Sequence, residues 1–358
     1  MEITDVFSEL LLDWYSQHRR DLPWRGGQDP YKIWISEVIL QQTQVCQGMP
    51  YYRRFLERYP SVSALARSTS EDVLRLWEGL GYYKRAHQLH RCAQLLERDY
   101  GGQFPSSYQE LCRLPGIGPY TAAAIASMAF RQVVPAIDGN VNRVITRVFG
   151  VMCDISKSAG RKLVSQIAYQ IIDRKSPDLF NHAMMDFGAL CCRSRAPLCK
   201  TCVFQKYCVA YAKHTQYLLP VKGQKAKKRT RYFHYYIIQY QDRFYLKIRD
   251  QKDIWLGLYD FYLIECDQAM SLNHVRDELL DMVGRYHVPV VDLKIRDIHQ
   301  LTHQTLVVHF HKIIINNDVK PVMDDFLEKK SLRPFTLQEV VGLPKSIVMQ
   351  RIIQRLTL

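Results

Sequence analysis

The chain has 358 residues, enough for two domains of roughly 150 residues each, and its hydrophobic (47%) and charged (23%) fractions exclude wholesale disorder. A formal net charge of +14 favours a polyanion such as nucleic acid over an acidic small molecule as partner, although charge alone fits a generally basic globular protein about as well. No basic and apolar leader follows Met1 and no apolar run is long enough to span a bilayer, so we expect neither a signal peptide nor a membrane segment.

Hydrophobic periodicity predicts an all-α first part. The expected helices cover Ile3–His18, Tyr31–Cys46, Tyr51–Tyr59, Ser70–Glu78, Lys84–Tyr100, Ser107–Arg113, Pro119–Phe130, Gly139–Phe149, Gly160–Asp173 and Asp178–Leu190. Short connectors rich in Gly, Pro and Asp separate them, and Ser107 and Glu110 have the spacing of a capping box. The first part is therefore expected to lack a sheet.

A tight turn before a helix marks the stretch from Leu114 to Phe130. Gly116 and Gly118 permit a sharp turn and close approach to a ligand, and Pro119 suits the first helical position. The free N–H groups of such a turn and helix end suit a phosphate. Downstream, Asp138 precedes another helix, where an ordinary N-cap is the alternative to a functional carboxylate.

Five of the ten cysteines lie between Cys191 and Cys208, and the others are isolated. The spacing Cys192-x6-Cys199-x2-Cys202-x5-Cys208 lets four thiolates close around one metal centre in a loop too short to have its own core. Both a tetrahedral zinc site and a four-iron cluster fit this spacing. Cys191 is an alternative first ligand, although the spacing to Cys199 favours Cys192.

The composition changes near residue 213. Residues 222–231 are basic and of low complexity, and we predict a linker over 213–231. Beyond it, strands are expected at Tyr232–Tyr240, Arg243–Ile248 and Thr305–Ile315, and helices at His274–Val283 and Lys345–Leu356. Residues 232–358 therefore form a predicted α+β domain.

The motif Leu114-Pro-Gly-Ile-Gly-Pro-Tyr-Thr-Ala122, Asp138 and the cysteine spacing together resemble the endonuclease III superfamily of helix-hairpin-helix DNA glycosylases over residues 1–212. Three further motifs, Ser36–Val45, Gly79–Tyr83 and Asn181–Asp186, resemble the adenine DNA glycosylase (MutY) branch. This resemblance implies an all-α glycosylase fold with its helix-hairpin-helix motif at about 107–130. It also implies a [4Fe–4S] cluster on a loop at 192–208, held by Cys192, Cys199, Cys202 and Cys208.

Glu37 is a candidate general acid from its neighbours alone. The positions three and four residues away are mostly apolar (Ile33, Trp34 and Leu40), and desolvation raises the pKa of a carboxyl group. The alternative is a glutamate at a face boundary with its head in solvent. In the family that the chain resembles, the glutamate matching Glu37 protonates N7 of the adenine base.

The resemblance also assigns a role to Asp138, as the anion that faces an oxocarbenium-like sugar, with Asn140 and Tyr120 lining the same site. We expect the helix N-terminus to keep the Asp138 carboxylate ionised. Bifunctional relatives carry at the position of Tyr120 a lysine that forms a Schiff base with the sugar. Tyrosine lacks the amine, which predicts base release by water without strand cleavage.

Contacts with DNA are expected on both sides of this site. The resemblance assigns Gly116 and Gly118 to the DNA backbone and Gln42 and Tyr82 to a wedge in the base stack, while helix-end packing is the alternative for Tyr82. Candidate phosphate or site contacts are Arg25 and, with it, Arg20 and Arg143. Each of these arginines could equally be a solvated surface charge.

The second part resembles, less closely, the MutT-like (Nudix-like) C-terminal domain of adenine glycosylases, through the motif Asp253–Phe261. The run Arg276–Gly284 lacks the paired glutamates of true Nudix hydrolases, so pyrophosphatase activity is not expected. The triplet Leu301-Thr302-His303 stands where the family has Phe-Ser-His, which implies recognition of 8-oxoguanine by Thr302 and His303. A buried structural histidine is the alternative for His303.

Together these features predict a monofunctional DNA glycosylase that removes adenine mispaired with 8-oxoguanine or guanine in double-stranded DNA. The resemblance further implies a monomer without membrane association, cytoplasmic and nucleoid-associated if the source is a bacterium. Two alternatives stay open: a glycosylase, with or without lyase activity, acting on oxidised pyrimidines or mismatched thymine, and a non-catalytic iron–sulfur protein that binds DNA.

Overall fold

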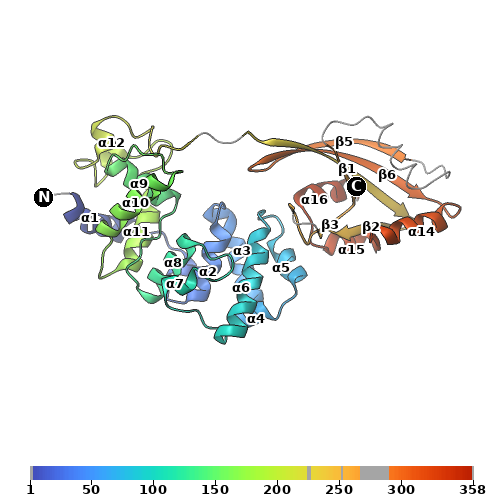
Figure 1. The fold of residues 1–358 in the computed structure, drawn as a ribbon, viewed down its shortest axis with the longest axis horizontal. Coiled ribbons are helices and arrows are strands. Elements are labelled where there is room, and N and C mark those ends of the chain that lie inside the picture. The colour runs from blue at the N-terminus through green and yellow to red at the C-terminus, as the bar shows by residue number, and fades with distance from the viewer. Residues whose placement is uncertain (1–2, 224–226, 251–252, 267–289, 357–358) are drawn as a thin grey trace. The chain divides into compact units, whose positions relative to one another are not determined.

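The computed structural model describes residues 3–223, 227–250, 253–266 and 290–356. The chain divides into two compact units, one made of residues 1–67 and 88–224 and the other of residues 68–87 and 225–358 (Figure 1). Helix α6 (Lys84–Tyr100) begins in the second unit and continues in the first. None of the helices described is long and apolar enough to cross a membrane.

The first unit is helical, as predicted. Besides α6 it contains α1 (Ile3–His18), η1 (Pro23–Arg25), α2 (Pro30–Leu40), α3 (Val45–Arg58), α4 (Val62–Ala66), α7 (Tyr108–Leu111), α8 (Pro119–Phe130), α9 (Gly139–Val148), α10 (Ser158–Ile171), α11 (Pro177–Leu190), η2 (Cys199–Thr201) and α12 (Val209–Ala212). The predicted capping box is wrong, because the Ser107 hydroxyl donates to the Gln109 side chain and caps no backbone N–H of α7.

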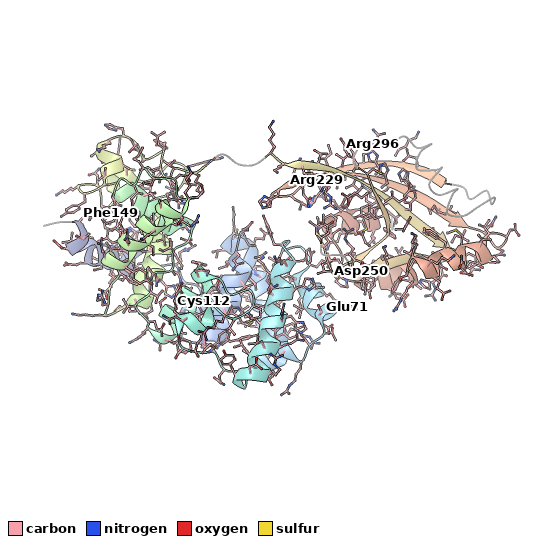
Figure 2. The ribbon with its side chains drawn as sticks, viewed as in Figure 1. Glu71, Cys112, Phe149, Arg229, Asp250 and Arg296 are labelled. Atoms are coloured by element: carbon pink, nitrogen blue, oxygen red, sulfur yellow. The ribbon has the colours of Figure 1, made fainter. Side chains whose placement is uncertain are left out.

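Aromatic side chains from distant parts of the first unit form its core. Phe7 of α1 stacks on Phe204 with ring centroids 4.4 Å apart. The Phe7 ring also contacts the rings of Phe180 and of Phe149, whose position is marked in Figure 2. Phe204 is fully buried and lies between Cys202 and Cys208 in the chain. Burial of this ring therefore anchors the cysteine loop to α1 and α11.

Helix α2 is buried nearly all round, from Tyr31 to Ile39, and packs against α8. The predicted helix Tyr31–Cys46 is wrong in its last part, because residues 41–44 are not helical and Gln42 has a φ of 58°. A close approach of α2 and α3 explains the break. A Cβ on Gly48 would lie 2.8 Å from Leu40 Cδ2, so the chain turns sharply to bring glycine against the end of α2.

The second unit combines helices with a mostly antiparallel sheet. Its helices are α5 (Ser70–Trp77), the start of α6, α14 (Lys320–Lys329), α15 (Leu337–Gly342) and α16 (Ile347–Leu356). Its strands are β1 (Arg229–Tyr240), β2 (Arg243–Ile248), β3 (Tyr259–Asp260), β4 (Tyr262–Cys266), β5 (Val290–Gln300), β6 (Gln304–Ile315) and β7 (Arg333–Thr336). The strand order is β3-β2-β1-β6-β5, with β4 on β1, β7 on β2, and β1 parallel to β6.

The second unit differs from the prediction in one strand boundary and in a strand that was not expected. Strand β1 begins at Arg229, inside the predicted linker, because residues 229–231 pair with 304–306 of β6. Strand β5, which the sequence analysis missed, precedes β6 and forms a hairpin with it. The predicted helix His274–Val283 and the run Arg276–Gly284 lie outside the described residues.

Candidate active site

A cavity of 1010 Å³ opens in the first unit among η1, α2, α8, α9 and α11. Four predicted catalytic side chains line it, namely Glu37, Tyr120, Asp138 and Asn140, together with the predicted DNA contacts Gln42 and Arg25. Its other lining residues are Arg20, Leu22, Trp24, Leu40, Gln41, Thr43, Gln44, Val45, Cys46, Ile137, Gly139, Asn142, His182, Met185 and Ala189. Segments more than a hundred residues apart in the chain thus meet around one space.

The Glu37 carboxyl group is buried, with 8% of the residue exposed, so the alternative of a head in solvent is wrong. Its Oε2 atom accepts a hydrogen bond of 2.6 Å from the Tyr120 hydroxyl. Burial raises the pKa of Glu37 to about 7, since the bond from Tyr120 opposes desolvation only in part and the nearby Asp138 charge adds to the rise. Near neutral pH this carboxyl group therefore exists in both protonation states.

Asp138 is the N-cap of α9, as predicted. Its Oδ1 accepts the Val141 N–H at 2.7 Å, and its Oδ2 accepts the Asn140 side-chain amide at 2.7 Å. These bonds favour the charged form, but burial outweighs them and the pKa of Asp138 is raised. Desolvation is therefore the larger effect on the pKa of Asp138, and the expectation that the helix N-terminus keeps this carboxylate ionised stays a prediction.

Arg143 connects the cavity to the cysteine loop. Its guanidinium donates to Asn140 Oδ1 at 2.8 Å, to the Gly188 carbonyl at 2.7 Å and to the Cys192 carbonyl at 2.8 Å. These three bonds exclude the alternative of a freely solvated surface charge. Asn140, held in this way from one side, is also held by Asp138 from the other.

Arg25 and Arg20 both bind the carboxylate of Asp186. Arg25 donates from Nη1 at 2.6 Å and from Nη2 at 2.8 Å, and Arg20 donates from Nε at 2.7 Å. The Asp186 side chain is fully buried and the Arg25 side chain is 9% exposed. Arg25 is thus not a solvated surface charge, and both of its terminal nitrogens are already engaged by a carboxylate.

The two glycines of the helix-hairpin-helix turn are required for different reasons. Gly116 has a φ of +77°, and a Cβ there would lie 2.5 Å from Gln88 Cβ, so both backbone and packing require glycine. Gly118 has an ordinary φ of −83° as the N-cap of α8, with open space around its Cα and no side-chain cap on the helix. Gly118 thus leaves the helix N-terminus accessible, which is what a phosphate contact needs.

The remaining predicted DNA contacts lie in the second unit. Tyr82 is 46% exposed, and its hydroxyl is hydrogen-bonded to that of Thr302. Leu301, Thr302 and His303 form the turn between β5 and β6, where the Leu301 N–H donates to the Gln304 carbonyl at 2.8 Å. His303 is exposed, so the alternative of a buried structural histidine is wrong.

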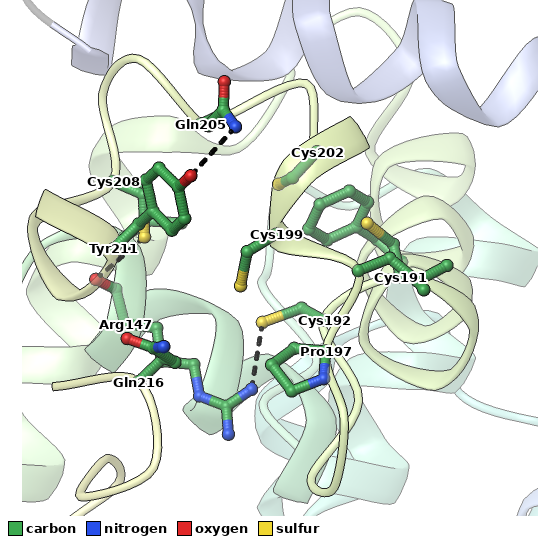
Figure 3. Close-up of a pocket in the computed structure, with 13 residues that line it drawn as sticks. Arg147, Cys191, Cys192, Pro197, Cys199, Cys202, Gln205, Cys208, Tyr211 and Gln216 are labelled. Carbon is green, nitrogen blue, oxygen red and sulfur yellow. Dashed lines mark hydrogen bonds between the residues drawn. The ribbon is translucent and has the colours of Figure 1, made fainter. Parts of the chain in front are cut away.

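Five cysteines line a second pocket in the first unit (Figure 3). They are Cys191, Cys192, Cys199, Cys202 and Cys208. Arg147, which is 3% exposed, donates to the Cys192 sulfur at 3.5 Å, and its own carbonyl faces the Cys208 sulfur at 3.4 Å. Within the described part of the chain, no three His, Cys, Asp or Glu side chains are arranged so that they could hold one metal ion. A sulfur-lined pocket beside a buried cation nevertheless suits an anionic, thiolate-bound group.

Comparison with known proteins identifies the family. Residues 35–170 match the model of the HhH-GPD superfamily of base excision DNA repair proteins. The adenine DNA glycosylase of Buchnera aphidicola from Schizaphis graminum is 35% identical over 72% of this chain and 74% of its own length. That of Buchnera aphidicola from Acyrthosiphon pisum is 31% identical over 96% of this chain and 95% of its own length. The chain belongs to the adenine DNA glycosylase family.

Membership makes this protein an enzyme, a DNA glycosylase of base excision repair. The mouse adenine DNA glycosylase is 41% identical over 59% of this chain and 43% of its own length. Among solved structures, a thermostable thymine-DNA glycosylase matches with a TM-score of 0.54 and 30% identity, covering 59% of this chain and 97% of that protein. An endonuclease III bound to DNA matches with a TM-score of 0.51 at 23% identity, which supports the fold, and covers 60% of this chain and all of that protein.

One face of the active-site cavity was not predicted from the sequence. His182, Met185 and Ala189 of α11 line the cavity, and Asp186 beside them binds both arginines. Burial lowers the pKa of His182 to about 3, so the imidazole is neutral. The spacing i, i+3, i+4 and i+7 along α11 was the available signal, because polar side chains interrupt an otherwise apolar helical face there.

Proposed function

We propose that this enzyme is a monofunctional glycosylase that hydrolyses the N-glycosidic bond of adenine mispaired with 8-oxoguanine or guanine in double-stranded DNA. One observation carries the proposal: two carboxyl groups with different partners, the buried Glu37 and the half-buried Asp138, line the same cavity. Glu37 receives one hydrogen bond, from a hydroxyl, whereas Asp138 receives two that favour its anion. Cleavage of a glycosidic bond requires a proton donor and an anion in the same site.

Glu37 is the proton donor in this mechanism. With a pKa of about 7, the carboxyl group is protonated in a large share of molecules at neutral pH and can give its proton to N7 of an adenine that occupies the cavity. The electron pair of the C1′–N9 bond then leaves with the neutralised base. Tyr120, bonded to Oε2, fixes the orientation of the carboxyl group.

Asp138 stabilises the positive charge that develops on the sugar. Its hydrogen bonds from Val141 and Asn140 hold the carboxylate in one orientation, so no reorganisation is needed when the cation forms. Arg143 locks Asn140 from the far side. Water then adds to C1′ and loses a proton, which leaves an abasic site.

Strand cleavage is not part of the proposed reaction. A Schiff base with the sugar needs an amine, and none of the described residues that line the cavity is a lysine. We expect that borohydride will trap no enzyme–DNA adduct during turnover, and that the strand will break only after alkali. A borohydride-stable adduct would assign the enzyme to the bifunctional glycosylases instead.

The cysteine pocket is proposed to hold a [4Fe–4S] cluster through Cys192, Cys199, Cys202 and Cys208. A cluster bound there would crosslink the loop that Phe204 anchors in the core. Purified protein should be brown, with the broad absorption of thiolate-to-iron charge transfer, and Cys199→Ser should lose that band. A colourless protein that contains zinc would overturn the assignment.

The second unit is proposed to recognise 8-oxoguanine opposite the adenine, as a Nudix-like domain without pyrophosphatase activity. Thr302 and His303 support this proposal because both are exposed at a hairpin tip, although the Thr302 hydroxyl is also hydrogen-bonded to that of Tyr82. Leu301 replaces the aromatic residue of the family motif, so packing against the lesion is expected to differ.

Single-turnover cleavage of four duplexes tests the whole proposal. They carry A:8-oxoguanine, A:G, T:G or thymine glycol opposite A, and alkali reveals the abasic product. We expect cleavage of the first two only. The T:G duplex is included because a thymine-DNA glycosylase shares the fold at 30% identity. Cleavage of T:G or thymine glycol without cleavage of the adenine mispairs would overturn the proposal.

A further inference from the structure

The hairpin before α6 holds an exposed aromatic ring in an unfavourable backbone conformation. Gly79 has a φ of 93°, Gly81 of 70° and Tyr82 of 49°, so three of the four residues 79–82 are left-handed. Glycine adopts such angles easily, but for tyrosine they cost free energy. Something in the surrounding structure must therefore hold Tyr82 in place.

Trp77 and Arg85, which flank this hairpin in the chain, both bind its backbone. The Trp77 indole N–H donates to the Gly81 carbonyl at 3.1 Å. The Arg85 guanidinium donates from Nη2 to the same carbonyl at 3.2 Å and to the Leu80 carbonyl at 3.4 Å. Two side chains thus fix the carbonyl groups that immediately precede Tyr82.

Arg85 also contacts the Tyr82 ring itself. Its Cζ lies 5.2 Å from the centroid of the fully buried Trp77 ring and 5.6 Å from that of Tyr82. Both distances are within the range of cation–π attraction. Burial lowers the pKa of Arg85 only to about 10, so the guanidinium stays charged at neutral pH. One cation therefore connects a fixed ring to an exposed one.

We propose that Arg85 is a positioning residue that holds the Tyr82 ring ready to enter the DNA base stack beside the mispair. The inference rests on the proposed function, in which Tyr82 is a wedge residue. A ring fixed before binding loses less conformational entropy on insertion, which lowers the barrier to extruding the adenine. Arg85 touches no reacting atom and acts only through Tyr82.

A double-mutant cycle separates this role from general support of the fold. Arg85→Met, which keeps the length of the side chain and removes its charge, is made in the wild-type and Tyr82→Ala backgrounds. Arg75→Met is the matched control. The Arg75 side chain of α5 is 53% exposed, and its ion pair with Glu71 has a long distance of 3.8 Å. Two quantities are measured: the single-turnover rate, and the fluorescence of 2-aminopurine next to an uncleavable adenine analogue, which rises when bases unstack.

In the wild-type background, Arg85→Met should lower the excision rate about fivefold to tenfold, the size expected for loss of one cation–π contact and its hydrogen bonds. The 2-aminopurine signal should fall with it. In the Tyr82→Ala background the same change should alter the rate less than twofold, because the group through which Arg85 acts is gone. Arg75→Met should match the wild type.

Equal losses from Arg85→Met in both backgrounds would overturn the inference, as would an unchanged 2-aminopurine signal. Arg85→Lys covers the case in which the methionine variant does not fold. Lysine keeps the charge but not the planar fork, so it should recover part of the 2-aminopurine signal, and no recovery in a folded variant counts against the role. Failure of the proposed function is distinguishable, because the wild-type enzyme would then leave adenine mispairs uncut.

Discussion

The cavity around Glu37 and the hairpin tip at residues 301–303 are built in opposite ways. In the cavity, the Glu37 carboxyl group accepts a hydrogen bond from Tyr120 and the Asp138 carboxylate accepts one from Asn140. At the hairpin tip, Thr302 and His303 are exposed, and the turn is held by the backbone. The groups proposed for chemistry are therefore fixed by the fold, whereas those proposed for recognition depend on what binds.

This contrast follows from what each task requires. A general acid needs a pKa near the working pH, and burial raises the pKa of the Glu37 carboxyl group to about 7. A recognition residue must discriminate between two bases and needs only access to their edges. Changes in the cavity should therefore affect every substrate alike, and changes at the hairpin tip should affect one substrate relative to another.

The largest expected effect is that of Glu37→Gln. Glutamine fills the same volume but has no proton to give, so the single-turnover rate should fall about 10³-fold on both A:8-oxoguanine and A:G duplexes. DNA binding should be retained, which a gel-shift measurement on the same duplexes checks. A loss on only one duplex would contradict the expectation that changes in the cavity affect every substrate alike. Retention of full activity would instead support the non-catalytic alternative.

Asp138→Asn should have the next largest effect. The amide keeps the size of the side chain but removes the anion that faces the sugar, and we expect a loss of about 10²-fold to 10³-fold in rate. Because Asp138 also caps α9, part of any change could come from a frayed helix. Asn is itself a good N-cap, so the thermal midpoint should change little, and a large fall in the midpoint would make the rate loss structural.

The sequence predicted the parts of the site that depend on local patterns. The apolar neighbours of Glu37 predicted its burial and raised pKa, and the position of Asp138 before a helix predicted its N-cap. Both inferences use only residues within one helical turn. They are reliable because the 3.6-residue period fixes which side chains share a face.

Contacts between distant segments were beyond the sequence. Asp186 binds Arg25 across 161 residues of chain, and the turn at residues 41–44 depends on Gly48 packing against α2. The sequence also did not show that desolvation raises the pKa of Asp138. In the second unit, β5 was missed, and a register shift between Asp292 and Ile295 interrupts its regular pairing with β6.

The stability of the enzyme should also report on Glu37, with a smaller effect. Its pKa in the folded state is raised to about 7 from an ordinary 4.5, so the folded state binds the proton more tightly than the unfolded state. The associated stabilisation is complete below pH 4.5 and is lost as the pH rises through 7. Relative to Glu37→Gln, the wild type should therefore lose up to about 3 kcal/mol of unfolding free energy between pH 5 and pH 8.

Urea unfolding of both proteins at the two pH values measures this difference. The glutamine variant does not titrate at residue 37, so it corrects for every other ionisable group. If the difference in unfolding free energy between the two proteins did not depend on pH, the Glu37 carboxyl group would be in contact with solvent. The cavity would then resemble the exposed hairpin tip, and the contrast between the two regions would fail.

Thr302→Ala should have the smallest effect and the most selective one. Removal of one hydroxyl that hydrogen-bonds a base edge costs on the order of 1 kcal/mol, or about fivefold in rate. We expect this loss for A:8-oxoguanine and less than twofold for A:G, because the hydroxyl is proposed to contact the oxidised base. Thr302→Ser is the matched control and should keep the preference. Thr302 is hydrogen-bonded to Tyr82, the proposed wedge residue. An equal loss of rate on both duplexes would therefore mean that Thr302 supports Tyr82 rather than recognises the oxidised base.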